Sequence, residues 1–222
     1  MRLHFDEQLA ELKTELTKMG AECEEVIALA AKALTQGEPE LAKKVVVIDG
    51  DIDRMERDIE SLCLKLLLQQ QPVARDLRQI SAAIKMITDM ERIGDQAADI
   101  AEIIGFLKGR TGDECEYISL MAKYTIKMVT ESVDAFVKQD INAARIAIGD
   151  DDTVDNYFDK VKQSLTELIR QNPDDSEYAL DLLMIAKYFE RIGDHAVNIA
   201  EWVIFSVTGI HDDGKNSIGG QA

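Results

Sequence analysis

Residues 91–102 read ERIGDQAADIAE, and residues 190–201 read ERIGDHAVNIAE. Nine of the twelve positions are identical at a constant distance of 99 residues, which is more than the shared composition of helical segments would produce. A weaker correspondence, 102 residues apart, relates Asp49, Ile52 and Asp53 to Asp151, Val154 and Asp155. Repetition at a fixed period indicates a duplicated structural unit. The chain is therefore predicted to consist of two similar halves that meet near residue 111.

Prolines and a glycine-containing stretch divide each half into three segments. Pro39, Pro72 and Pro173 are the only prolines, and each stands at the start of a segment, where a helix does not need its missing amide hydrogen. Inside the segments, apolar residues recur at alternating spacings of three and four, which is typical of helices that pack together. In the first segment these residues are Leu9, Leu12, Leu16, Met19, Cys23, Val26, Ala30 and Ala33. The six segments lie at about 6–36, 39–70, 73–108, 114–138, 140–171 and 174–208.

Long segments with short connections predict the architecture. Helices of about 30 residues are rods of roughly 45 Å, and short links make neighbouring rods antiparallel. We therefore predict an all-α fold class with two tandem three-helix bundle repeats, built from six long antiparallel helices. The first repeat is predicted to occupy 1–110 and the second 111–208, while 209–222 show no pattern and are predicted to be a disordered tail.

Charge and composition exclude several classes of protein. Among the 222 residues there are 42 Asp and Glu but 25 Lys and Arg, so the formal net charge is −17. This surplus argues against nucleic acid as a partner, because binding to a phosphate backbone requires basic side chains. The three cysteines are too few and too scattered for a disulfide framework or a zinc site. No apolar run resembles a signal peptide or a membrane span, so a soluble cytoplasmic protein is expected.

Acidic residues gather on one face of several predicted helices. These groups are Glu91, Asp95, Asp99 and Glu102; Glu190, Asp194, Asn198 and Glu201; Asp49, Asp53, Glu56 and Glu60; and Asp151, Asp155 and Asp159. Like charges one turn apart repel, and partial burial strengthens the repulsion. Arg92 and Arg191 are candidates to neutralise it, but one arginine cannot balance three or four carboxylates. A bound cation can, and ligation by oxygen alone favours Mg²⁺, Ca²⁺, Mn²⁺ or oxidised iron over zinc and copper.

Two interpretations of these acidic faces stay open at this point. A charge-rich helix face is usually just solvated, and a duplication also preserves a helix pair whose role is only structural. Gly94 and Gly193 lie within predicted helices, where each glycine costs roughly 1 kcal/mol relative to alanine. Either another helix approaches closely at these glycines, or room is left there for a ligand.

The two Glu-Arg-Ile-Gly-Asp segments, at 91–95 and 190–194, closely resemble the signature of the PhoU family. The resemblance covers nearly the whole chain, since it extends to the length, the six helices, the two three-helix repeats and the acidic motif in both halves. It implies a cytoplasmic all-α bundle that forms a homodimer, is not an enzyme and carries multinuclear metal clusters. Carboxylates would bind these clusters, with iron as the first expectation and Mg²⁺, Mn²⁺ or Ca²⁺ as alternatives.

The resemblance also implies which residues form the site. The expected metal ligands are Glu91, Asp95, Asp99, Asp49 and Asp53 in the first half and Glu190, Asp194, Asn198, Asp151 and Asp155 in the second, with Arg92, Arg191, Glu102 and Glu201 around them. Asn198 replaces the acid found at Asp99, so the second cluster is expected to hold fewer ions. Asp89 in the first half has Tyr188 as its counterpart, so the two sites need not bind alike.

The implied role is the control of phosphate uptake. Proteins that resemble this one are negative regulators of bacterial phosphate uptake and of the phosphate-starvation response. They act as adaptors between the ATPase subunit of the phosphate ABC transporter and a sensor histidine kinase. Contact with the membrane is therefore expected only through these partners.

Two other functions are weighed against this role. A carboxylate-bridged di-metal enzyme of the ferritin-like type needs a Glu-x-x-His motif on two helices, and no Glu in the sequence has His three residues later. No catalytic residues are therefore expected. His195, whose counterpart is Gln96, is predicted to be a packing or hydrogen-bonding residue. A metal-free helical scaffold is the third hypothesis.

Overall fold

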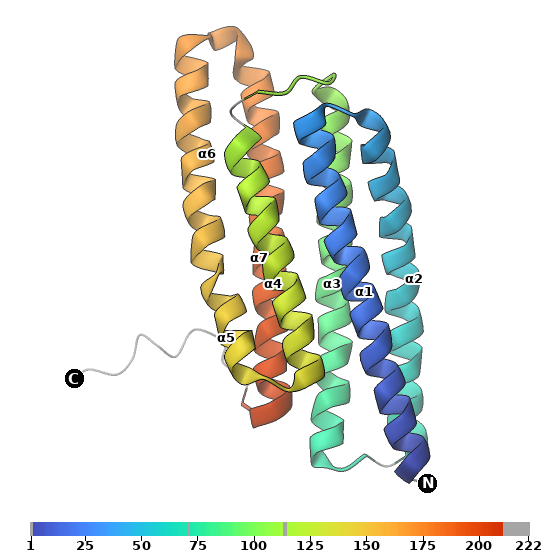
Figure 1. Ribbon diagram of the computed structural model, residues 1–222. Helices are drawn as coiled ribbons and strands as arrows, with labels where there is room; N and C mark the ends of the chain where they lie inside the picture. The colour runs from blue at the N-terminus through green and yellow to red at the C-terminus, as the bar shows by residue number, and fades with distance from the viewer. Residues whose placement is uncertain (1, 71, 113–114, 211–222) are drawn as a thin grey trace, which may run out of the picture.

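The structure, a computed structural model, describes residues 2–70, 72–112 and 115–210. Within these ranges the chain forms seven α-helices, and a 3-10 turn precedes the last of them (Figure 1). The helices are α1 (Arg2–Gln36), α2 (Pro39–Gln70), α3 (Ala74–Phe106), α4 (Glu116–Lys138), α5 (Ile141–Gly149), α6 (Asp151–Gln171) and α7 (Ser176–Thr208), and the turn η2 is Pro173–Asp175. The predicted all-α fold class is confirmed. Most of the predicted tail, from residue 211 onward, lies outside the described residues.

The fifth predicted segment is interrupted once. α5 ends at Gly149, and α6 begins at Asp151 after the single residue Asp150. Glycine, here Gly149, is a poor helix former. In addition, Lys127 Nζ of α4 donates a hydrogen bond of 2.6 Å to the Asp150 carboxylate, so the interruption contacts a neighbouring helix. The corresponding part of α2 continues as one helix, so the two halves of the chain differ here.

The two halves of the chain lie side by side. α1, α2 and α3 pack against one another, and α4, α6 and α7 do the same in the second half. The halves meet where α3 packs against α7 and α1 packs against α4, which leaves α2 and α6 on the two flanks (Figure 1). Successive long helices run in opposite directions, as the short connections predict.

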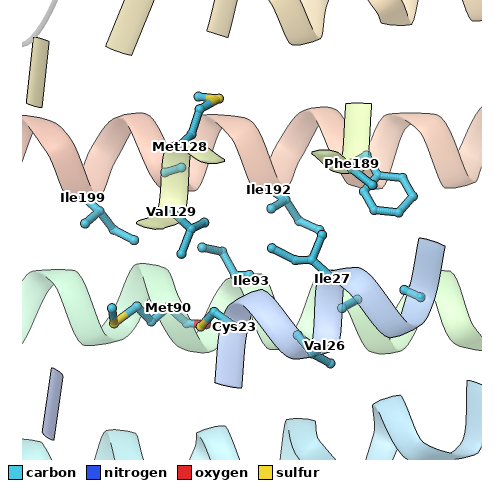
Figure 2. Packing of buried hydrophobic residues seen from close by; sticks show 14 of the residues in the cluster. Cys23, Val26, Ile27, Met90, Ile93, Met128, Val129, Phe189, Ile192 and Ile199 are labelled. Carbon is cyan, nitrogen blue, oxygen red and sulfur yellow. The ribbon is translucent and has the colours of Figure 1, made fainter. Parts of the chain in front are cut away.

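One apolar core runs through both halves. Figure 2 shows its centre, where side chains from α1, α3, α4 and α7 meet. The labelled residues are Cys23, Val26, Ile27, Met90, Ile93, Met128, Val129, Phe189, Ile192 and Ile199. The apolar seam of α1 is fully buried at Leu12, Leu16 and Met19, so this seam packs within the chain.

α3 and α7 carry the two ERIGD segments. The third residue of each segment, Ile93 in α3 and Ile192 in α7, is fully buried in the core. Close packing on that face prevents α3 and α7 from rotating about their axes or sliding along them. The acidic residues of each segment therefore have fixed positions, beside α2 for α3 and beside α6 for α7. None of the helices in the described part of the chain is long and apolar enough to cross a membrane.

Candidate metal centres

In the first half, α2 lies close against α3 at Gly94. A Cβ atom at this position would lie 2.7 Å from Asp49 Oδ1 and 3.2 Å from Ile52 Cδ1, so a larger residue would displace side chains of α2. Asp49 Oδ1 is buried and has no hydrogen-bond partner among the described residues. A glycine in the middle of a helix therefore makes room for a carboxylate from the neighbouring helix.

The second half repeats this arrangement at Gly193. A Cβ atom there would lie 3.1 Å from Asp151 Oδ1 and 3.6 Å from Val154 Cγ1. Asp151 Oδ1 is likewise buried, without a hydrogen-bond partner in the part of the chain that the structure describes. Close approach of another helix thus accounts for both mid-helix glycines. A carboxylate oxygen that is buried and unpaired destabilises the fold unless positive charge lies nearby.

Carboxylates from two helices surround Asp49 in the first half. Burial, followed by the charges of other carboxylates, raises the pKa of Asp49 to about 6. Those carboxylates are Asp53 on α2 and Asp95 and Asp99 on α3. Burial and then the charge of Asp95 also raise the pKa of Glu91. The structure therefore brings these predicted ligands together as one group, which we call the first acidic group.

The second acidic group forms in the same way between α6 and α7. Burial, followed by the charges of other carboxylates, raises the pKa of Asp151 to about 6. Those carboxylates are Asp155, Asp194, Glu190 and Asp152, in falling order of effect. Burial and then the charge of Glu190 also raise the pKa values of Asp155 and Asp194.

Glu56 belongs to the first acidic group although it is not among the predicted ligands. Burial, and then the charge of Glu60, raises the pKa of Glu56, and Glu56 in turn helps to raise the pKa of Glu91 on the facing helix. Its spacing of three residues from Asp53, on the same acidic face, is the signal in the sequence that identifies it. The second half has Phe158 at this position.

Basic side chains pair with part of each acidic group. In the first group, Arg92 Nη1 lies 2.8 Å from Asp95 Oδ2, and Arg92 Nε lies 3.4 Å from Glu91 Oε2. In the second group, Lys187 pairs with Glu190. With the side chains in these positions, no three His, Cys, Asp or Glu residues of the described chain are spaced to hold a metal ion. Carboxylates would have to turn away from their basic partners to share a cation.

Two predicted ligands contact the opposite half of the chain. Asn198 Nδ2 donates a hydrogen bond of 3.0 Å to Asp89 Oδ1, and His195 Nδ1 lies 2.9 Å from the same oxygen. At the equivalent place in the other half, Tyr188 lies beside Asp99 and opposes the rise in the pKa of Asp99 that burial causes. Asp99 and Asn198 therefore lie where α3 and α7 meet. His195 has the hydrogen-bonding role that was predicted for it.

The four residues expected around the ligands are placed unequally. Arg92 pairs within its own half, whereas the charge of Arg191 acts on Asp99 of the other half. There it opposes a rise in the pKa of Asp99 that burial causes. Glu102 is exposed one turn beyond Asp99, and Glu201 is half-buried on α7.

The donors of both groups fit a hard cation. Each group contains a buried carboxylate oxygen without a hydrogen-bond partner among the described residues, and a helix pair held close by a glycine. Further carboxylates stand around this oxygen, and they come from both helices. Oxygen donors of this kind suit Mg²⁺, Ca²⁺, Mn²⁺ or oxidised iron. The residues are therefore compatible with the metal that the resemblance implies.

Comparison with known proteins identifies the repeated unit. Residues 16–104 and 118–203 match the PhoU domain. The chain is 34% identical to the phosphate-specific transport system accessory protein PhoU homolog of Clostridium acetobutylicum, over 92% of this chain and 94% of that protein. It is also 34% identical to the homolog of the same name from Synechocystis, over 94% and 93% of the two chains.

Solved structures agree with this result. The crystal structure of PhoU from Pseudomonas aeruginosa has a TM-score of 0.87 and 34% identity, and covers 93% of this chain and 100% of that one. The phosphate transport system regulatory protein PhoU from Streptococcus pneumoniae has a TM-score of 0.85 and 26% identity, with coverage of 94% and 99%. The fold and the paired acidic helices define a duplicated helical-bundle protein. The chain belongs to the PhoU family.

Gly94→Ala is expected to disturb the first acidic group, because the added methyl group collides with Asp49 and Ile52. Alanine contributes up to about 1 kcal/mol of helix propensity, and the collision offsets this gain. Gly50→Ala on α2 is the matched control, since a Cβ atom there meets nothing within 4 Å and should stabilise the protein by about 0.5–1 kcal/mol. Urea denaturation measures both changes. Equal stabilisation by the two variants would contradict the close approach at Gly94.

Metal-stripped protein is expected to become more stable as the pH falls from 7 to 5. The pKa of Asp49 and Asp151 is about 6 in the folded protein, well above the ordinary value, so folding favours the protonated carboxyl groups. Their stabilising effect is complete below the unfolded pKa and is lost as the pH rises through 6. Allowing for solvent screening, we expect about 1 kcal/mol for the pair, measured by urea denaturation. In the variant Asp49→Asn with Asp151→Asn, the free energy of unfolding should change less between pH 7 and 5 than in the wild type. A variant whose change equals that of the wild type, or a wild type that loses stability as the pH falls, would contradict the burial of these groups.

Proposed function

We propose that the protein is a non-enzymatic, metal-binding regulator of phosphate uptake. One observation carries the metal-binding part: a buried carboxylate oxygen, unpaired within the described chain, lies over a glycine of the facing helix in both halves. Membership of the PhoU family supports the link to phosphate, because its relatives are named as accessory proteins of phosphate-specific transport systems.

The carboxylates of each helix pair are the proposed ligands. They are Asp49, Asp53, Glu91 and Asp95 in the first acidic group and Asp151, Asp155, Glu190 and Asp194 in the second, with Asp99 and Asn198 at the edge of each. A multivalent cation, with iron as the first candidate, supplies the positive charge that these groups lack. The carboxylates would then hold α2 against α3 and α6 against α7 instead of repelling across each pair.

The proposed action is that of an adaptor. When phosphate is plentiful, the protein contacts the ATPase subunit of the phosphate ABC transporter and a sensor histidine kinase, and so restrains uptake and the starvation response. The long helix α2 on one flank suits such contacts, because its outer face exposes Val46, Val47 and Leu64. Assembly as a homodimer and a cytoplasmic location belong to the same proposal.

Metal-stripped protein is expected to bind Mn²⁺ and to melt at a higher temperature in its presence. A ligand at 100 times its Kd stabilises the folded state by about 2.7 kcal/mol per site. Asp49→Asn with Asp151→Asn should lose this stabilisation, because it removes the buried oxygen charge from both groups. Titration calorimetry and thermal melts measure the effect, and they are repeated with Mg²⁺, Ca²⁺ and iron.

A matched variant controls for the change in net charge. Glu40→Gln with Glu167→Gln removes the same number of charges from exposed positions on α2 and α6, so it should bind metal as the wild type does. Wild-type protein that takes up none of these ions and melts unchanged would overturn the metal-binding proposal. The metal-free scaffold would then be the better description.

The adaptor role predicts specific partners. Tagged protein, isolated from cells of its own species grown with ample phosphate, should retain the ATPase subunit of the phosphate transporter and the sensor kinase. Mass spectrometry identifies the retained proteins, and the same isolation after phosphate starvation provides the comparison. Absence of both partners under ample phosphate would contradict the adaptor role without bearing on metal binding.

A further inference from the structure

The two acidic groups differ at one place where their helices face each other. In the second half, Lys187 Nζ of α7 lies 5.7 Å from the ring centroid of Phe158 on α6, and it pairs with Glu190. The corresponding residues of the first half are Thr88 and Glu56. A lysine and an aromatic ring therefore stand where the first half has a hydroxyl group and a carboxylate.

The charge of Lys187 acts on both helices of its pair. Besides pairing with Glu190 on its own helix, Lys187 opposes the rise in pKa of Asp155 on α6 and of Asp194 on α7. The Lys187 side chain is exposed, and its ammonium group lies on the side of α7 that faces the Phe158 ring of α6. A positive charge in this place acts as a bound cation would, because it attracts carboxylates from both sides.

In the first half, the paired basic residue stays on one helix. Arg92 contacts Glu91 and Asp95, and all three residues belong to α3. Glu56 on α2 adds a further negative charge, and it helps to raise the pKa of Glu91 across the helix pair. Arg57 opposes the rise in pKa of Glu56 on its own helix α2. Among the described residues, neither arginine is thus found to act on carboxylates of both α2 and α3, as Lys187 acts on both α6 and α7.

We propose that Lys187 is a built-in counter-ion of the second acidic group, so that the first group binds a metal ion more tightly and fills first. This inference rests on the metal binding proposed above.

Full-length variants with one intact group separate the two affinities. Asp151→Asn with Asp155→Asn leaves the first group, and Asp49→Asn with Asp53→Asn leaves the second. Titration calorimetry with Mn²⁺ alone should give a Kd roughly tenfold lower for the first group. A difference of this size is expected when one nearby positive charge competes with the cation in the second group and none does so in the first. In wild-type protein the two groups should then fill in sequence.

Substitution of the lysine tests its role directly. In the protein that retains the second group, Lys187→Thr should tighten Mn²⁺ binding roughly fivefold. Lys162→Thr is the matched control, because Lys162 lies 5.0 Å from the same ring but pairs with Asp159. It removes the same charge and should change the Kd less than about twofold. In the protein that retains the first group, Thr88→Lys should weaken binding.

Thermal melts give a second measurement that needs no metal. In metal-stripped protein, Lys187→Thr should lower the melting temperature more than Lys162→Thr, because the second group loses its counter-ion. Equal Kd values and equal melts for the two lysine variants would overturn the role of Lys187 and leave the proposed function intact. Tighter binding by the second group than by the first would also overturn it. Wild-type protein that binds no Mn²⁺ would overturn the proposed metal binding and this inference together.

Discussion

In both halves of the molecule, a buried carboxylate lies against the glycine of a neighbouring helix, and this contact determines the electrostatics of each helix pair. Gly94 lets Asp49 Oδ1 of α2 lie against α3, and Gly193 lets Asp151 Oδ1 of α6 lie against α7. The helices cannot move apart to relieve the resulting repulsion, because their apolar faces are buried in the common core. Relief must come from protons or from positive charge, and the raised pKa of both aspartates expresses this constraint.

The duplication has preserved the backbone arrangement more faithfully than the charges. Both halves keep the glycine, the buried aspartate and the close helix pair. The positive charge differs, however. Arg92 pairs with carboxylates of its own helix in the first half, whereas Lys187 in the second half pairs with Glu190 and also acts on Asp155 of the facing helix. The two acidic groups are thus alike in shape and unlike in electrostatics.

Local features of the sequence predict most of the fold and only part of the site. Apolar spacing and three prolines predict the long helices, and the repeated ERIGD segments predict which carboxylates meet. The position of Asp99 beside Tyr188 depends on the pairing of α3 with α7, which periodicity within a helix does not specify. The contact of Lys187 with the ring of Phe158 likewise joins two helices, α7 and α6. Contacts between elements, rather than patterns within them, account for these differences.

The single core that joins both halves has a consequence for the meaning of the repeat. Met90 and Ile93 of the first half lie in the same buried cluster as Phe189 and Ile192 of the second (Figure 2). If the chain were cut at the junction, each fragment would expose to water the apolar side chains that the other half covers in the intact protein. The two repeats therefore share one apolar core, and neither repeat buries its apolar face without the other.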